Sequence, residues 1–317
     1  ANGGVTWTPI FDSVGVASVG AVAVAPSDPR VVYVGTGNQS GWSFTTGKGI
    51  YKSTDAGRTW TSTGLAASQY VGAIAVDPKN ANTVLVAAIG ARAGGAGRGA
   101  AAAAPAPAGE RGVYHSTDGG RNWIRVLPTD GSSGASDLWM DYGDPQVVYA
   151  GLSGGAGTGI HKSIDGGVAW TPVGGKGLPD GARISAFTVA SGTHGRRLYA
   201  LAGGGGRGAT GPPRGLYRSD DGGDSWVFGT SKLASGGGKI YADPQRPDVV
   251  YVMGTAIYRS TDAGRSVAAF WGAPSGADPR FLWIDPTNSK RFITGVDQGA
   301  AISVDDGATF TPYYGIV

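Results

Sequence analysis

One eight-residue pattern occurs six times along the chain, and it constrains the fold more than any other feature. The clearest copies read Ser-x-Asp-x-Gly-x-(Thr/Ser/Asn/Ala)-aromatic, and successive copies begin 41 to 63 residues apart. The copies occupy 53–60, 116–123, 163–170, 219–226, 260–267 and 303–310. Such spacing is typical of a repeat protein, in which one small unit recurs and buries its apolar faces against its neighbours. We therefore expect one repeated architecture in the 317 residues and not two ordinary domains.

Each copy lies in a wider unit that contains four short apolar runs. In the second unit, for example, an alternating run at 71–80 ends in an Asp-Pro turn, and a second run follows at 83–88. Alternation of apolar and polar residues indicates β-strands. Four short strands per unit predict an all-β fold, a β-propeller of four-stranded blades. The predicted blade units are 19–63, 71–127, 138–173, 184–228, 238–270 and 280–315.

The octapeptide itself has the composition of a tight turn. Asp and Ser side chains accept hydrogen bonds from nearby backbone N–H groups, and the Gly supplies a positive φ. Local hydrogen bonding explains these residue types without any catalytic role. The aspartates predicted to be structural are Asp55, Asp118, Asp165, Asp221, Asp262 and Asp305.

This octapeptide resembles the Asp-box, or BNR, repeat, and the similarity extends over nearly the whole chain. Segments 3–12, 73–80, 215–223 and 282–307 resemble the sortilin-type, VPS10-like propellers and bacterial BNR-repeat proteins that are often labelled glycosyl hydrolases. The resemblance implies a propeller of up to ten blades, of which this chain would cover the N-terminal half. It implies less about activity, because one fold supports unrelated functions.

The two ends of the chain predict an incomplete ring. Residues 3–10 closely repeat 166–173, so the chain opens inside a blade and 3–10 is predicted to be an orphan strand. Residues 308–315 already supply a fourth strand for the last unit. Two alternatives follow. The chain is a portion of a longer polypeptide or pairs with other chains, or else it closes as a ring of six or seven blades. An unpaired blade edge would favour strand addition and self-assembly.

Glycine and proline account for 58 and 18 residues. Much of this excess lies in the octapeptide turns and strand-connecting loops, and the remainder is concentrated in two segments. Residues 91–112 form a low-complexity insertion between the second and third strands of their blade. Residues 203–215 are a shorter Gly-rich segment at the same position two blades later. We expect both to be loops on one face that contribute nothing to the core.

Carboxylates that the repeat leaves unexplained are few. Glycoside hydrolysis needs two carboxyl groups in different protonation states, but the single glutamate, Glu110, lies in the low-complexity insertion. After the octapeptide and Asp-Pro turns are set aside, the candidate aspartates that the repeat does not explain are Asp137, Asp141, Asp180 and Asp297. Asp297 is the weak catalytic candidate. The Arg-Ile-Pro motif of sialidases and the early acidic blade motif of xyloglucanases are both missing, which argues against hydrolysis.

Polar and aromatic loop residues suggest a binding surface instead. We expect a loop of the first unit and a loop of the last unit to converge on one face of the propeller. The candidate residues are Asn38, Gln39, Trp42, Asp297 and Gln298. Trp271 is a further loop anchor of the kind that stacks on sugars or forms protein hot spots. Trp139 and Trp283 lie in first strands and are expected in the core.

Composition excludes several other classes. There is no cysteine, and His115, His161 and His194 lack the spacing of metal ligands, so no metal and no cofactor is expected. The basic residues are scattered and the net charge is only +3, which argues against nucleic-acid binding. No apolar run is long enough to span a membrane. Absence of cysteine is compatible with an extracellular, cell-surface or periplasmic protein whose leader has been removed.

These observations lead to one principal prediction and one alternative. The principal prediction is an extracellular non-catalytic propeller that serves protein–protein interaction or self-assembly, with a protein partner or further copies bound through blade edges. The alternative is a carbohydrate-active enzyme of glycosidase type, or a glycan-binding module.

Overall fold

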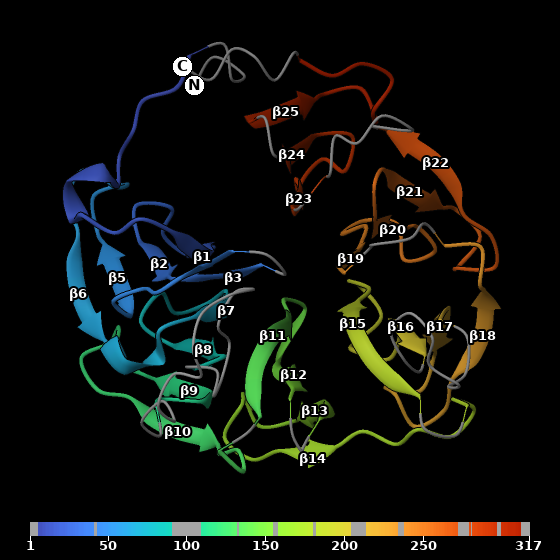
Figure 1. The fold of residues 1–317 in the computed structure, drawn as a ribbon, viewed down its shortest axis with the longest axis horizontal. Coiled ribbons are helices and arrows are strands. Elements are labelled where there is room, and N and C mark those ends of the chain that lie inside the picture. Colours follow the sequence, from blue (N-terminus) through green and yellow to red (C-terminus); the bar gives the residue numbers. More distant parts are fainter. Residues whose placement is uncertain are drawn as a thin grey trace, which may run out of the picture. The chain divides into compact units, whose positions relative to one another are not determined.

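The computed structural model confirms an all-β propeller fold (Figure 1). It describes residues 6–40, 43–90, 109–131, 133–154, 158–179, 182–203, 214–233, 238–271, 279, 281–296 and 299–311. Apart from two single-turn 3-10 helices, η1 (Asp12–Val14) and η2 (Ala66–Ser68), the regular structure of these residues is all strand. No helix in the described part is long and apolar enough to cross a membrane.

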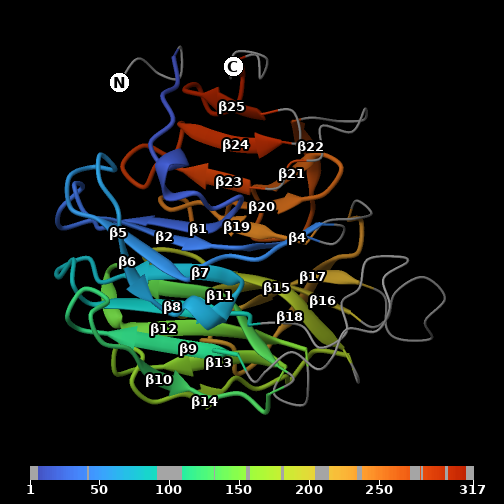
Figure 2. The same ribbon diagram turned by 60° about the vertical axis from the view of Figure 1, so that its left-hand side comes forward.

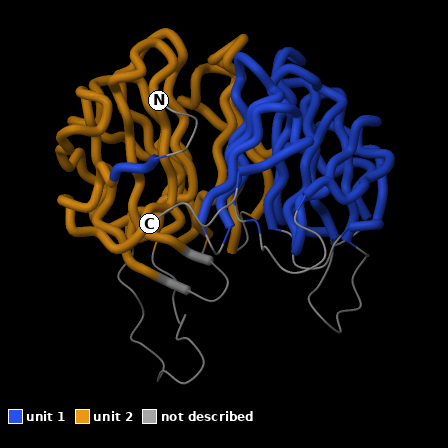
Figure 3. Tube along the Cα trace, turned by 90° about the horizontal axis from the view of Figure 1, so that it is seen from above, with its two compact units in different colours: residues 1–8, 173–317 blue, residues 9–172 orange. Residues whose placement is uncertain are grey.

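The chain divides into two compact units, residues 9–172 and residues 1–8 with 173–317 (Figure 3). The unit of residues 9–172 contains three four-stranded antiparallel sheets, ordered β1-β2-β5-β6, β10-β9-β8-β7 and β11-β12-β13-β14. A small hairpin, β3–β4, is inserted between β2 and β5. The strands are β1 (Val19–Val24), β2 (Val32–Thr36), β3 (Asn38–Ser40), β4 (Ser43–Thr45), β5 (Ile50–Ser53), β6 (Thr61–Gly64), β7 (Val71–Val76), β8 (Val84–Ala88), β9 (Gly112–Ser116), β10 (Ile124–Leu127), β11 (Gly134–Asp141), β12 (Asp144–Ser153), β13 (Gly159–Ser163) and β14 (Thr171–Pro172).

The second unit contains two further four-stranded sheets, β15-β16-β17-β18 and β19-β20-β21-β22, and the three-stranded sheet β23-β24-β25. Figure 2 shows these last three strands side by side. The strands are β15 (Arg183–Val189), β16 (Leu198–Gly203), β17 (Gly215–Ser219), β18 (Val227–Thr230), β19 (Ile240–Ala242), β20 (Val250–Met253), β21 (Ile257–Ser260), β22 (Ala268–Trp271), β23 (Phe281–Ile284), β24 (Phe292–Val296) and β25 (Gly299–Ser303).

The second strand of each blade forms the buried centre of its sheet. Four of these strands place a fully buried tyrosine at the same repeat position, namely Tyr33, Tyr149, Tyr199 and Tyr251. The Tyr33 hydroxyl donates to the carbonyl of Ala81 (2.8 Å), and the Tyr199 hydroxyl donates to that of Pro247 (2.7 Å). Each acceptor lies in the first turn of the following blade. A buried phenol needs a partner, so Tyr33 and Tyr199 join adjacent blades.

Two predicted edge strands differ from the structure. The described part of the orphan strand, residues 6–10, is not a strand, and the carbonyl of Ile10 accepts a hydrogen bond from the Trp60 indole (2.7 Å). In the last blade, Thr311 N–H donates to the Ile302 carbonyl (2.8 Å), but Ile302 N–H donates back to the threonine hydroxyl (2.9 Å). These two hydrogen bonds do not form a fourth strand up to residue 311. Residues 312–315 lie outside the described part.

Candidate functional site

The six octapeptides adopt the same hydrogen-bonded turn. In the first copy, the buried Ser53 hydroxyl donates to Asp55 Oδ1 (2.7 Å) and accepts the N–H of Gly57 (2.8 Å), while Asp55 Oδ1 accepts the N–H of Thr59 (2.9 Å). In the other five copies the Ser–Asp distance is 2.7 to 2.8 Å and the Gly–Ser distance 2.8 to 2.9 Å. The side chains of all six aspartates are therefore occupied within their own turns.

The charge state of these aspartates does not suit a general acid. A side-chain hydrogen bond from Thr59 and its backbone N–H lower the pKa of Asp55 to about 2. The backbone and side-chain bonds of Asn122 lower the pKa of Asp118 to about 2, and those of Thr309 do the same for Asp305. Every described carboxyl group whose pKa clearly departs from its usual value is shifted downward. A glycosidase acid needs the opposite shift.

Asp141 proves to be part of the repeat. It ends β11 at the position that Asp77, Asp243 and Asp285 occupy in other blades, and its Oδ1 accepts the N–H of Gly143 (2.9 Å) in the same manner. Asp141 is 6% exposed, and its Oδ2 finds no partner among the described residues. The repeat pattern leaves this aspartate unexplained because its blade has Asp-Tyr-Gly where the other three have Asp-Pro.

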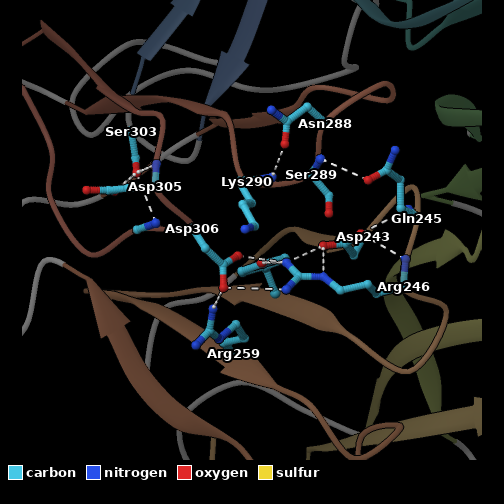
Figure 4. A network of polar contacts seen from close by, with 12 residues as sticks. Asp243, Gln245, Arg246, Arg259, Asn288, Ser289, Lys290, Ser303, Asp305 and Asp306 are labelled. Carbon is cyan, nitrogen blue, oxygen red and sulfur yellow. Dashed lines mark hydrogen bonds and ion pairs between the residues drawn. The ribbon is translucent and has the colours of Figure 1, made fainter.

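A network of arginines and aspartates joins the last two blades (Figure 4). Arg246 Nη2 lies 2.7 Å from Oδ2 of the fully buried Asp243 and 2.8 Å from Oδ1 of Asp306. Arg259 contacts the other oxygen of Asp306 (3.2 Å). Because both carboxylates of this network are neutralised by arginine, we assign it a structural role and exclude it as a substrate site.

Of the remaining acidic residues, Asp137 lies on β11 and Glu110 precedes β9. The Ser136 hydroxyl donates to Asp137 Oδ2 (3.0 Å), and Glu110 Oε2 accepts the N–H of Ala67 in η2 (3.0 Å). Asp137 and Trp139 share one partly exposed face of β11. Asp180 and Asp297 lie outside the described residues.

The predicted binding residues are only partly described. Asn38 is exposed on β3, at the start of the inserted hairpin, and Gln39 follows it in the strand. Trp42, Asp297 and Gln298 lie outside the described residues, so convergence of the two groups on one face stays a prediction. Trp271 ends β22 half-buried, and its ring lies 4.9 Å from that of Phe310.

The structure instead exposes an aromatic surface on two neighbouring first strands. Phe281 and Trp283 of β23 are 48% and 41% exposed, and Tyr241 of β19 meets Phe281 edge to face with ring centroids 6.1 Å apart. The hydroxyl of Thr294, on β24, donates a hydrogen bond to the Phe281 carbonyl (2.9 Å). We call Tyr241, Phe281 and Trp283 the first-strand aromatic surface.

The expectation that Trp283 belongs to the core is wrong. Along β23 the side chains alternate, so Leu282 and Ile284 are buried while Phe281 and Trp283 face away from the core. Leu282 and Ile284 belong to a buried cluster with Val249, Tyr251 and Phe292, and Phe281 and Trp283 lie on the opposite face of the strand. Strict alternation of aromatic and aliphatic residues in 281–284 was the available signal.

Comparison with known proteins indicates a class of function that the geometry alone does not identify. No model of a known protein family matches the chain. A xyloglucanase from Hypocrea jecorina (strain QM6a) is 25% identical over 324 aligned positions, which cover 84% of this chain and 35% of that protein. The chain thus spans about a third of that curated relative.

Two solved structures share the fold. The GH74 xyloglucanase from Xanthomonas campestris aligns with 95% of this chain and 48% of its own, at a TM-score of 0.65 and 20% identity. YCF48 bound to D1 peptide aligns with 95% of this chain and 82% of its own, at a TM-score of 0.59 and 12% identity. At these identities both likenesses establish the fold alone.

The sequence relative corrects the principal functional prediction. The prediction of a non-catalytic module for protein interaction or self-assembly is wrong, since the sequence similarity runs to a xyloglucanase. Similarity over 84% of the chain outweighs the absence of one short acidic motif. The carbohydrate-active alternative agrees better with the comparisons.

Proposed function

We propose that this chain is the polysaccharide-binding propeller of an exported glycoside hydrolase with Asp-box blades. The observation that carries the proposal is the first-strand aromatic surface. Phe281 and Trp283 present two large rings side by side on β23, and Tyr241 extends the surface onto β19. Rigid exposed rings are suited to the apolar faces of sugar rings, and they lose little conformational entropy on binding. Similarity to a xyloglucanase favours a β-glucan backbone as the ligand.

We propose Asp297 as a catalytic carboxyl group of this hydrolase. In sequence it follows Gly295 by two residues, and Gly295 pairs with Phe281 across β24 and β23. The octapeptide aspartates are held ionised by their turns, and Asp243 and Asp306 are neutralised by Arg246. In the sequence, Asp297 lies outside the octapeptides and outside the Asp-Pro turns.

Binding to xyloglucan tests the proposal directly. In affinity electrophoresis through xyloglucan gels, we expect Phe281→Ala and Trp283→Ala each to weaken retardation by about tenfold, because each removes a stacking ring. Phe228→Ala is the matched control, since Phe228 is 52% exposed on β18, a fourth strand of the same unit. Equal effects of Phe281→Ala and Phe228→Ala, or no binding by the wild type, would reject the proposal.

Turnover tests the role of Asp297 separately. Release of reducing sugar from xyloglucan should fall by about 10²- to 10⁴-fold in Asp297→Asn, the range for loss of a general acid or base. Retardation in the xyloglucan gel should stay unchanged. A variant that hydrolyses as fast as the wild type would remove Asp297 from the mechanism without affecting the binding surface.

A further inference from the structure

The strands β23, β24 and β25 lie side by side (Figure 2) and form a sheet with one buried face and one face that solvent reaches. Leu282, Phe292 and Ala301, one on each strand, are at most 2% exposed and lie on the buried face. They alternate with exposed or half-buried residues, so the face that carries Phe281 and Trp283 continues across β24 to β25. We call it the outer face, and its residues are Phe281, Trp283, Ile293, Gly295, Ala300 and Ile302.

Strand register sorts the outer face into two rows of different height. Residues that pair directly in an antiparallel sheet have side chains next to each other on one face. Phe281 pairs with Gly295, and Gly295 pairs with Ala300, so one row has a ring followed by a hydrogen atom and a methyl group. The surface is therefore low at Gly295 and Ala300, which we call the low row. The other row carries large side chains on every strand, namely Trp283, Ile293 and Ile302.

The described part of the fold gives no reason for a glycine at position 295. A glycine inside a strand weakens the strand, and it marks a bulge, a bend, or the close approach of another backbone or of a ligand. The register is continuous on both sides of β24, and φ of Gly295 is not positive. A Cβ added to Gly295 would meet, among the described residues, only the Cβ of Phe281, at an ordinary 3.7 Å. Gly35, the penultimate residue of β2 as Gly295 is of β24, differs because its Cβ would lie 2.3 Å from Cγ1 of Val71. Approach of a ligand is the reason that is left for Gly295.

We infer that the low row receives the sugar branches of a substituted β-glucan whose backbone stacks on Phe281 and Trp283. This inference rests on the proposed function and specifies its substrate class. A branch projects sideways from a backbone sugar, so side chains of full height beside the rings would hold a branched backbone away from them. The absent side chain of Gly295 removes that obstacle next to Phe281, and the small side chain of Ala300 extends the space to β25. An unbranched glucan has no group to place there and gains nothing from the space.

A comparison of a branched and an unbranched polymer tests this inference. In affinity electrophoresis, we expect the wild type to bind xyloglucan about tenfold more tightly than an unbranched mixed-linkage β-glucan. Gly295→Val fills the low row with a side chain that strands accept. It should lower xyloglucan affinity by about tenfold and change affinity for the unbranched glucan by less than about twofold. Ala300→Val should act in the same direction from β25, and it provides the test if Gly295→Val does not fold. Ala269→Val is the matched control, because it makes the same enlargement at an exposed position of β22 in the same unit.

The outcomes separate this inference from the proposed function. Equal losses for both polymers in Gly295→Val and Ala300→Val would overturn the inference, and so would unchanged xyloglucan binding by Ala300→Val. A wild type that binds the unbranched glucan as tightly as xyloglucan would overturn it as well. In each of these cases, xyloglucan binding that still depends on Phe281 would leave the proposed function standing. If neither polymer binds, the proposed function fails together with the inference.

Discussion

At the scale of single residues, the octapeptide is a complete hydrogen-bonding unit. Its serine is buried and its aspartate accepts backbone N–H groups four residues on, so the turn needs no outside partner. The fourth residue lies in the left-handed region in every copy, and it is Gly119, Gly166 and Gly222 in three copies. Ala56, Ala263 and Asp306 adopt the same conformation at φ of 60° to 63°. The turn therefore tolerates the strain of a Cβ at this position.

The depressed aspartate pKa values predict how stability depends on pH. Asp55, Asp118 and Asp305 have a pKa of about 2 in the fold, against an ordinary value of 3.8. Between these values the unfolded chain binds more protons than the folded chain, so protonation favours unfolding. Stability from these groups is thus present above about pH 4 and lost as the pH falls toward 2. Denaturant titrations at a series of pH values measure this loss.

A single substitution tests the cause of the low pKa of Asp118. Asn122→Ala removes the side-chain hydrogen bond that holds Asp118 ionised, so the pKa of Asp118 should rise toward 3.8. NMR titration of the carboxyl carbon measures it, with Asp305 in the same spectra as an internal reference. A pKa for Asp118 that does not move would contradict the assigned hydrogen-bond origin.

At the scale of elements, glycines allow neighbouring first strands to approach closely. A Cβ added to Gly20 on β1 would lie 2.2 Å from the Val71 carbonyl oxygen, and one added to Gly72 on β7 would lie 2.3 Å from that of Ser136. Both obstacles are backbone atoms, which cannot rotate away. The repeated Val-Gly-Ala start of β1 and β7 thus reflects packing between blades.

Substitution of Gly72 tests this contact. Gly72→Ala should destabilise the protein by about 1–3 kcal/mol, the usual cost of overpacking. Gly238→Ala is the control, because a Cβ there meets no atom within 4 Å and φ is not positive. Its effect should stay within about 0.5 kcal/mol. Chemical denaturation measures both variants, and equal effects would mean that the close approach of β7 and β11 is not retained in solution.

At the scale of the whole molecule, the chain consists of two compact units, each with its own buried clusters. Leu85 is fully buried in the unit of residues 9–172, and Leu201 is fully buried in the other. In repeat architectures each blade is stabilised mainly by its neighbours. Damage to one core should therefore weaken nearby blades first.

Paired core variants measure that locality. Leu85→Ala and Leu201→Ala should each cost about 2–5 kcal/mol of stability through the cavity they leave. Hydrogen exchange should show the loss of protection concentrated in β7–β13 for the first variant and in β15–β21 for the second. Uniform loss of protection across both units would show instead that the chain unfolds as one cooperative body.

Local chemistry explains what the sequence determined by itself. The six repeated units, the order of the strands within them and the octapeptide turns follow from period-two alternation and hydrogen bonds that close within eight residues. Such interactions depend on neighbours in the chain, so the pattern of residues was enough to predict them. The same local reasoning failed at residues 6–10, where a strand forms only if a distant edge pairs with it.

The tertiary structure alone decided which side chains are available for function. Trp283 is 41% exposed on β23, and Asp306 is neutralised by Arg246 from 60 residues away. Exposure and pairing depend on contacts between blades that are remote in sequence. For that reason the repeat pattern determined the scaffold, and packing between repeats determined the candidate site.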